Sequence, residues 1–290
     1  MAYVQEAVFP AGSRGTQSSA RPQNLLLLRM PRVAGLSVIE FIPSEARILW
    51  AKVLLGVISL YAVLRISGFQ SLFLNDAEGI AALLQIIGTL YSVLYAFATY
   101  VIWGQFTAVE SEILKESGSL KDLLVFSRPL PERARDPIVR AVKNYARNVV
   151  EAEWGALSRH EETEKTDRLF LEIVSSVMEA APESAAQSVI FERVLVLANQ
   201  ASSHRDERLA LSVKRMPRTL HYFVGLTAFM IFLLVLCYPF HGVVLGASSV
   251  VITSMLLFFA RFVLTDLDNP FEGSWNASNE PFAELITKFR

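Results

Sequence analysis

The sequence predicts an all-α integral membrane protein with four transmembrane helices, arranged as two hairpins, and a helical cytoplasmic region between helices 2 and 3. Hydrophobic residues make up 52% of the 290 residues and charged residues only 19%, whereas charged residues form roughly a quarter of an average soluble domain. Two long stretches, 79–109 and 219–260, contain no Asp, Glu, Lys or Arg. Segment 104–218 shows no strand-like alternation and no Asn-Gly turn.

The overall charge and the cysteine content exclude several classes of protein. Lys and Arg number 27 against 28 Asp and Glu, a net charge of −1, so nothing suggests binding to nucleic acid. A single cysteine, Cys237, excludes an internal disulfide framework and a Cys-rich metal site. The phosphate-binding loop, the dinucleotide fingerprint and the nucleophile elbow are absent. We therefore expect no enzyme, no cofactor and no bound metal.

The N-terminal segment 1–44 is expected to be cytoplasmic and largely disordered. Residues 11–23 are small, polar and rich in Gly, Ser and Pro, a composition that cannot form a packed core. The apolar run at 25–28 is too short for the core of a signal peptide, so we do not expect a secreted, cleaved product. Met1 and Met30 are both candidate translation starts.

Residues 45–104 are predicted to form the first transmembrane hairpin, with spans at about 48–66 and 80–103. Lys52 and Arg65 leave only 12 uncharged residues between them in the first span, but both lie near its ends, where long side chains can reach the headgroups. The second span lies in a charge-free stretch and is rich in aromatic residues toward its end, as is typical of a membrane surface.

Residues 105–218 are predicted to be the cytoplasmic helical region. Ile138, Val142, Tyr145 and Val149 fall at intervals of three and four residues, which places them on one face of a helix. Similar stripes follow along the rest of the segment. These helices are expected either to extend the membrane helices as a bundle or to pack against neighbouring subunits.

Residues 219–264 are predicted to form the second hairpin, with spans at about 219–238 and 243–264. One helix over 42 charge-free residues would be about 63 Å long, twice the hydrocarbon thickness. The chain must therefore turn back, and Pro239 and Gly242 mark the turn.

The distribution of Lys and Arg predicts the topology. The connections 67–79 and 239–242 contain neither, whereas 1–47 has five arginines and 104–218 has 17 Lys and Arg. Both termini, including the polar tail 265–290, are therefore expected to be cytoplasmic. The protein is expected to be a multi-pass protein of the inner (cytoplasmic) membrane.

Several charged residues have two interpretations. Arg65 could form a positive ring at the outer mouth of an oligomeric pore, or it could be a headgroup anchor, which base rates favour. Arg205 and Arg208 lie one helical turn apart. Salt bridges from them to Glu110, Glu153 or the acidic tail are favoured over anion or lipid binding.

The acidic pair Asp266 and Asp268 also has two interpretations. The two carboxylates could take part in a cation site, since hard cations prefer carboxylate oxygens. Two are too few for a complete ligand set, and Asp268, Asn269 and Pro270 are typical of a turn that ends a helix. The structural role is favoured.

Short motifs spread over residues 45–290 resemble a bacterial membrane family of unknown function that carries a bestrophin-like domain. The matching residues are an aromatic second span that leads into Val109-Glu110, then Asn144-Tyr145, Glu153-Trp154, Arg205-x-x-Arg208-Leu209, Pro217 and Asp268-Asn269-Pro270-Phe271-Glu272-Gly273. The resemblance implies a distant likeness to bestrophins, which are pentameric anion channels with a narrow neck. It implies four spans, a helical cytoplasmic part and a homo-oligomer, with a pentamer as the model.

The leading hypothesis for function is an oligomeric, passive anion channel of chloride type in the lipid bilayer. Its pore would be lined by the second span, with Tyr91, Tyr95 or Tyr100 narrowing it and Arg65 attracting anions. No Asp, Glu or His lies near the middle of any span, which disfavours a proton-coupled transporter. The alternative is a membrane scaffold or sensor whose cytoplasmic helices bind a protein partner. Second-span aromatic residues packed inward within one subunit would favour that alternative.

Overall fold

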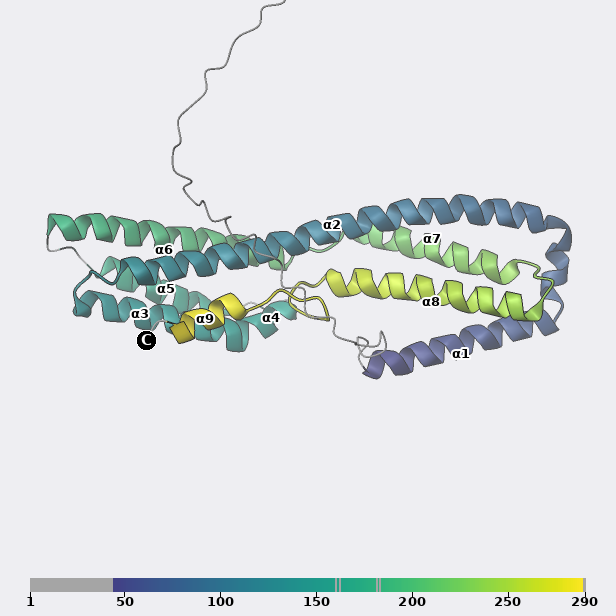
Figure 1. Cartoon of the computed structure of the whole chain (residues 1–290), viewed down its shortest axis with the longest axis horizontal. Helices are drawn as coiled ribbons and strands as arrows, with labels where there is room; N and C mark the ends of the chain where they lie inside the picture. The colour runs from purple at the N-terminus through teal and green to yellow at the C-terminus, as the bar shows by residue number, and fades with distance from the viewer. Residues whose placement is uncertain (1–43, 160, 162, 181, 183, 289–290) are drawn as a thin grey trace, which may run out of the picture. The chain divides into compact units, whose positions relative to one another are not determined.

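The computed structural model describes residues 44–159, 161, 163–180, 182 and 184–288. The described residues form helices joined by turns, and no β-strand occurs among them, so the all-α prediction is confirmed (Figure 1). The predicted disorder before residue 44 and the two candidate translation starts lie outside the described residues.

Within the described ranges, three segments are long and apolar enough to cross a membrane. The first joins η1 (Phe69–Asp76), a 3₁₀ turn, to α2 (Ala77–Phe126), and the other two are α7 (Arg218–Cys237) and α8 (Val243–Leu267). They overlap the second, third and fourth predicted spans. The helix α1 (Ser44–Ile66) occupies the place of the first predicted span, and its crossing of the membrane stays a prediction.

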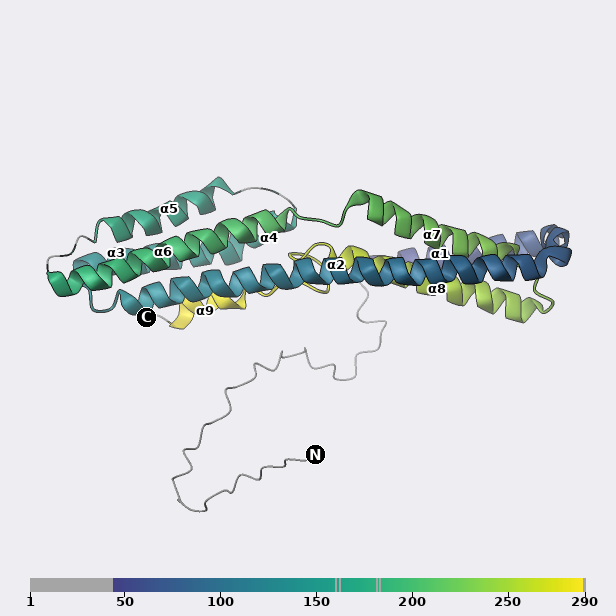
Figure 2. The same cartoon turned by 90° about the horizontal axis from the view of Figure 1, so that it is seen from above.

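The helix α2 connects the two parts into which we divide the described chain. We call residues 44–104 and 218–267 the membrane part, and residues 105–217 and 268–288 the head. At 50 residues, α2 is about 75 Å long, more than twice the hydrocarbon thickness. Helices α7 and α8 pack along its first half, and α6 packs along its second half (Figure 2).

The head is a helical bundle closed around a continuous apolar core. Besides α2 it contains α3 (Glu132–Asn148), η2 (Val149–Glu153), α4 (Trp154–Ser158), α5 (Glu164–Met178), α6 (Ala185–Ser212) and α9 (Glu280–Lys288). The predicted apolar face of Ile138, Val142, Tyr145 and Val149 is fully buried in this core. The element η2 is a π-helical turn between α3 and α4. Such turns are rare in proteins overall, and those that occur are often at functional sites.

The membrane part is held together by two smaller apolar clusters and by one very close approach. Tyr61 of α1 is buried, and its hydroxyl oxygen lies 2.0 Å from where a Cβ on Gly246 of α8 would stand. Only glycine fits at position 246 while the tyrosine keeps this place. The contact brings α1 against α8.

Candidate functional site

One face of α2 in the membrane part is not covered by any described helix of the chain. Apolar side chains that are 43–76% exposed recur on it every three or four residues: Leu83, Ile86, Leu90, Val93, Phe97 and Tyr100. We call these six residues the α2 stripe. Exposed hydroxyl groups of Thr89 and Ser92 lie beside it, each donating to a carbonyl oxygen of the same helix. The face is uncharged and has a mixed apolar and hydroxyl character.

The structure separates the three tyrosines of the second span. Tyr100 belongs to the α2 stripe and is 76% exposed. Tyr91 and Tyr95 lie on the other side of the helix, half-buried against the apolar clusters of the membrane part, with their rings stacked 5.9 Å apart. Two of the three tyrosines therefore pack within the chain, and one is free to meet a second copy or a pore.

Arg65 lies at the end of α1 and joins the two hairpins. Its guanidinium donates to the carbonyl oxygens of Phe240 at 2.9 Å and His241 at 3.2 Å, and to the amide oxygen of Gln70 at 3.3 Å. The buried Gln70 in turn donates to the Leu236 carbonyl at 3.0 Å. None of these acceptors neutralises the positive charge. Arg65 thus fixes the turn between α7 and α8 and carries a charge at this end of the membrane part.

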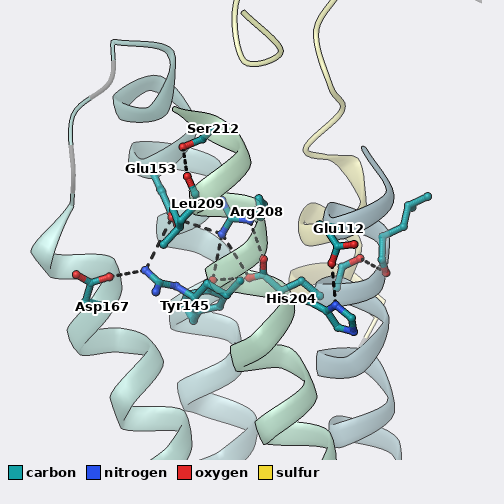
Figure 3. Close-up of polar contacts among 12 residues, drawn as sticks. Glu112, Tyr145, Glu153, Asp167, His204, Arg208, Leu209 and Ser212 are labelled. Carbon is teal, nitrogen blue, oxygen red and sulfur yellow. Dashed lines mark hydrogen bonds and ion pairs between the residues drawn. The ribbon is translucent and has the colours of Figure 1, made fainter. Parts of the chain in front are cut away.

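A largely buried cluster of charges lies in the head, between α2, η2, α5 and α6 (Figure 3), and of its members only Asp167 is more than half exposed. Arg208 is fully buried and donates from Nε to Glu116 Oε2 at 2.7 Å. Its Nη2 lies 3.4 Å from Glu153 Oε1. Arg205, one helical turn away and 7% exposed, pairs with Asp167 and lies 4.0 Å from the same Glu153 oxygen. We call these five residues the ion cluster.

Aromatic side chains enclose the ion cluster. Tyr145, also fully buried, donates from its hydroxyl to Glu116 Oε1 at 2.5 Å. Burial and the nearby carboxylates raise the pKa of Tyr145 well above its ordinary value, so the hydroxyl keeps the proton that it donates. The Phe282 ring of α9 stacks on the Arg208 guanidinium, 5.6 Å from ring centre to Cζ. Trp154 packs edge-on against Phe282.

The sequence analysis correctly favoured ion pairs for Arg205 and Arg208, but it identified only one of their partners. Both arginines form ion pairs, and Glu153 is one of the predicted partners. Glu116 and Asp167 were missed, and no ion pair of the described residues joins the arginines to Glu110 or to a tail carboxylate. A signal for Glu116 exists, because it lies between Ile113 and Leu120 on the buried face of α2.

The Asp268–Gly273 motif links the head to the start of α7. The Asp268 carboxylate accepts from the Met216 backbone N–H at 2.8 Å, one residue before Pro217, which caps α7. Asn269 donates to the Ser158 carbonyl at 3.0 Å. Pro270 accepts from the Ala277 N–H at 2.8 Å, and the Phe271 ring packs edge-on against Trp154 at 5.1 Å.

Gly273 and Asp266 form the second half of this link. The Asp266 carboxylate accepts from the backbone N–H groups of Ser274 and Trp275, each at 3.1 Å. Gly273 has φ +92°, and a Cβ there would lie 2.3 Å from Asp266 Oδ1. Both acidic side chains of this segment are occupied by backbone donors, which agrees with the helix-ending role. Among the residues that the structure describes, no cluster of three metal-ligating side chains occurs.

Comparison with known proteins identifies the family. A family model for the bestrophin-like domain matches residues 51–282, and no curated protein sequence matches. Two crystal structures of a bacterial bestrophin homologue from Klebsiella pneumoniae, each with one substitution, match with TM-scores of 0.61 at 11% and 12% identity. Each match covers 81% of this chain and 97% of that one.

A further crystal structure, described as that of a membrane protein, matches with a TM-score of 0.60 at 10% identity and covers 81% of this chain and 96% of that one. At such low identity these likenesses establish the fold alone. The family model extends over most of the sequence and over both the membrane part and the head. The chain therefore belongs to the bestrophin-like family.

Proposed function

We propose that the chain assembles into a homo-oligomer that conducts small anions of chloride type passively across the inner membrane. The observation that carries the proposal is the α2 stripe, an uncharged face left open in a single copy, on a chain of the bestrophin-like family. Bestrophins are pentameric anion channels with a narrow neck. A ring of α2 helices with their stripes facing an axis would form such a neck.

The pore face in this proposal is the α2 stripe, with Phe97 and Tyr100 as the bulky members that narrow it. Tyr91 and Tyr95 were also predicted to line the pore. In this proposal they hold α2 against the other helices instead, because they pack inward. Arg65 supplies a positive charge near one end of the membrane part, and anions are drawn toward such a charge. The roles of Phe97, Tyr100 and Arg65 in conduction stay predictions.

The proposed topology has four spans, with α1 as the first. The excess of Lys and Arg in the head and before α1 favours a cytoplasmic location for both. The proposed divisions are the cytoplasmic segment 1–44, the hairpins 45–104 and 219–264, the cytoplasmic region 105–218 and the cytoplasmic tail 265–290.

A membrane scaffold or sensor without transport activity is the second candidate. It is favoured by the inward packing of Tyr91 and Tyr95 and by exposed apolar side chains on the head, among them Leu171, Met178 and Val189. Exposed apolar patches on a helical bundle are typical of protein interfaces. This candidate predicts a folded oligomer or complex without chloride flux.

Chloride flux from proteoliposomes distinguishes the two candidates. Phe97 on α2 is 57% exposed and Phe229 on α7 is 55% exposed, so they form a matched pair. We expect flux from the wild-type protein, and Phe97→Ala should raise it severalfold because it widens the neck. Phe229→Ala faces lipid in this proposal and should leave the flux unchanged.

Two outcomes would contradict the channel. The first is the absence of flux from liposomes that contain confirmed oligomers, which would favour the scaffold. The second is an equal effect of Phe97→Ala and Phe229→Ala, which would show that the flux does not pass along the α2 stripe. For Arg65, an Arg65→Glu variant with unchanged ion selectivity would remove its proposed role.

A further inference from the structure

A cavity of about 260 Å³ lies in the head beside the ion cluster, with room for a molecule of several heavy atoms. The π-helical turn η2, the start of α5 and the end of α6 surround it. Its wall includes Glu153, Thr163, Asp167, Arg205, Leu209 and Ser212. It is separate from the α2 stripe, which belongs to the membrane part.

Two buried polar atoms on side chains that line the cavity have no hydrogen-bond partner among the described residues, and Arg208 Nη1 of the ion cluster, which is not a lining residue, has none either. The two atoms on lining side chains are Glu153 Oε2, on a side chain only 1% exposed, and Arg205 Nε, on a side chain 7% exposed. An unsatisfied buried charged group is costly, and in native structures it calls for a specific explanation. One atom is an acceptor and the other a donor, so a single bound molecule could satisfy both.

The chain positions Glu153 in an unusual way. The residue is the last of the π-helical turn η2, an element that is frequent at functional sites. Glu153 Oε1 lies 3.4 Å from Arg208 Nη2 and 4.0 Å from Arg205 Nη2. The short ion pairs of these arginines go to Glu116 and Asp167.

Counting charges indicates what the cavity would accept. The ion cluster holds three carboxylates, those of Glu116, Glu153 and Asp167, against two guanidiniums. With all groups ionised its net charge is −1, and Glu153 is the carboxylate without a short ion pair. Glu161, which also lines the cavity, pairs with Arg159 at 2.9 Å. A ligand with one positive charge would neutralise the cluster, and a charge-assisted hydrogen bond to a buried carboxylate is among the stronger polar contacts.

We propose that this cavity binds a small protonated amine with a neighbouring oxygen atom. The ammonium group donates to Glu153 Oε2, and the oxygen accepts from Arg205 Nε. The same chemistry occurs in a free amino alcohol and in the ethanolamine headgroup of a lipid. The head site is independent of ion conduction, so its test does not depend on whether the protein is a channel.

Ethanolamine is the probe that tests the proposal on the full chain in detergent without phosphatidylethanolamine. A ligand that binds the folded state raises the melting temperature with its concentration. We expect this shift with ethanolamine and not with ethylene glycol, which lacks the charge. Glu153→Gln should weaken the binding about tenfold or more, the value of a charge-assisted hydrogen bond. Glu151→Gln removes an exposed carboxylate from the same turn and should leave the binding unchanged.

A second pair of variants keeps the ion cluster intact. Val213, directly after α6, lines the cavity and is 64% exposed, whereas Val189 within α6 is 69% exposed and does not line it. Val213→Trp should block the cavity and abolish the ethanolamine shift, and Val189→Trp should not. This pair of variants still tests whether ethanolamine binds in the cavity if Glu153→Gln fails to fold.

The two sources of the amine are separated by nanodiscs of defined lipid. If ethanolamine binds more weakly in nanodiscs of phosphatidylethanolamine than in nanodiscs of phosphatidylcholine, the lipid headgroup competes for the cavity and is its occupant. If ethanolamine binds equally in both kinds of nanodisc, the occupant is a free amine. The proposal is overturned if ethanolamine produces no shift. It is also overturned if the shift survives Glu153→Gln or Val213→Trp, or if density in the cavity is that of water alone.

Discussion

The head and the membrane part use their apolar residues in opposite ways. In the head, the apolar faces of α2, α3, α5, α6 and α9 meet within one copy and form a continuous core, and Arg208, Glu116 and Glu153 are buried together. In the membrane part, small clusters join the helices, while long rows of apolar side chains on α1, α2, α7 and α8 stay exposed. A single copy therefore closes the core of the head, whereas the membrane part requires lipid and, in our proposal, further copies.

The difference has a physical cause. Water drives apolar side chains into the head core, so removing the partner of a charge buried there is strongly destabilising. Lipid gives no such drive between helices, and close packing takes its place. The stability of the head should thus be most sensitive to substitutions that remove a buried charge. The stability of the membrane part should be most sensitive to substitutions that disturb close packing between helices.

The largest effect is expected from Arg208→Met in the head. The substitution leaves Glu116 and Glu153 buried without their main cation, and breaking a buried ion pair from one side costs about 3–5 kcal/mol. Equilibrium unfolding followed by circular dichroism measures the loss. The control is Arg168→Ala, which breaks an exposed pair with Glu164 and should cost less than about 1 kcal/mol. Similar losses for both variants would contradict the importance of burial.

An intermediate effect is expected from Gly246→Ala in the membrane part. The new methyl group would collide with the Tyr61 hydroxyl, and overpacking of this kind costs about 1–3 kcal/mol. Gly225→Ala on α7 meets nothing within 4 Å and should be neutral or stabilising. Adding Tyr61→Phe to Gly246→Ala should restore part of the thermal stability in detergent. No rescue would argue against the packing of α1 on α8.

The smallest effect is a pH dependence of the head that Glu153 causes. Burial raises the pKa of Glu153 more than the guanidiniums of Arg208 and Arg205 lower it. The folded head thus binds this proton more readily than the unfolded chain. Its stability should rise as the pH falls from 7 toward 4.5, the ordinary value for Glu, by about 1.4 kcal/mol for each unit of pKa shift.

Glu153→Gln checks this prediction, since the variant cannot titrate at the position. Unfolding at a series of pH values should show a flatter profile for the variant than for the wild type. The other charged groups around Glu153 are Glu116, Asp167, Arg205 and Arg208. A wild-type profile that falls steadily from pH 7 to 5 would show that one of these carboxylates dominates instead.

Much of the fold was predictable because absence of charge is a signal that a single sequence carries. The second hairpin was predicted at about 219–238 and 243–264, and the helices run over Arg218–Cys237 and Val243–Leu267. The second span was expected at 80–103, but α2 continues to Phe126. The continuation occurs because the acidic residues after Val109 are interspersed with apolar residues that enter the head core.

The arrangement of the site was less predictable, because it depends on contacts between distant segments. Nothing in the sequence distinguishes Tyr91 from Tyr100, which differ only in the face of α2 that the other helices happen to cover. The π-helical turn that carries Glu153 was not predicted from the sequence. The pairing of Arg205 with Asp167 depends on how α5 lies against α6.

Cysteine accessibility in proteoliposomes tests most directly whether the α2 stripe faces water in the assembled protein. In a Cys237→Ser background, which removes the native cysteine, Phe97→Cys and Phe229→Cys place a thiol on α2 and on α7. A water-soluble thiol reagent should modify Phe97→Cys and reduce its chloride flux, and it should leave Phe229→Cys unmodified. Equal protection of both positions would mean that lipid covers both faces, and it would contradict a pore along α2.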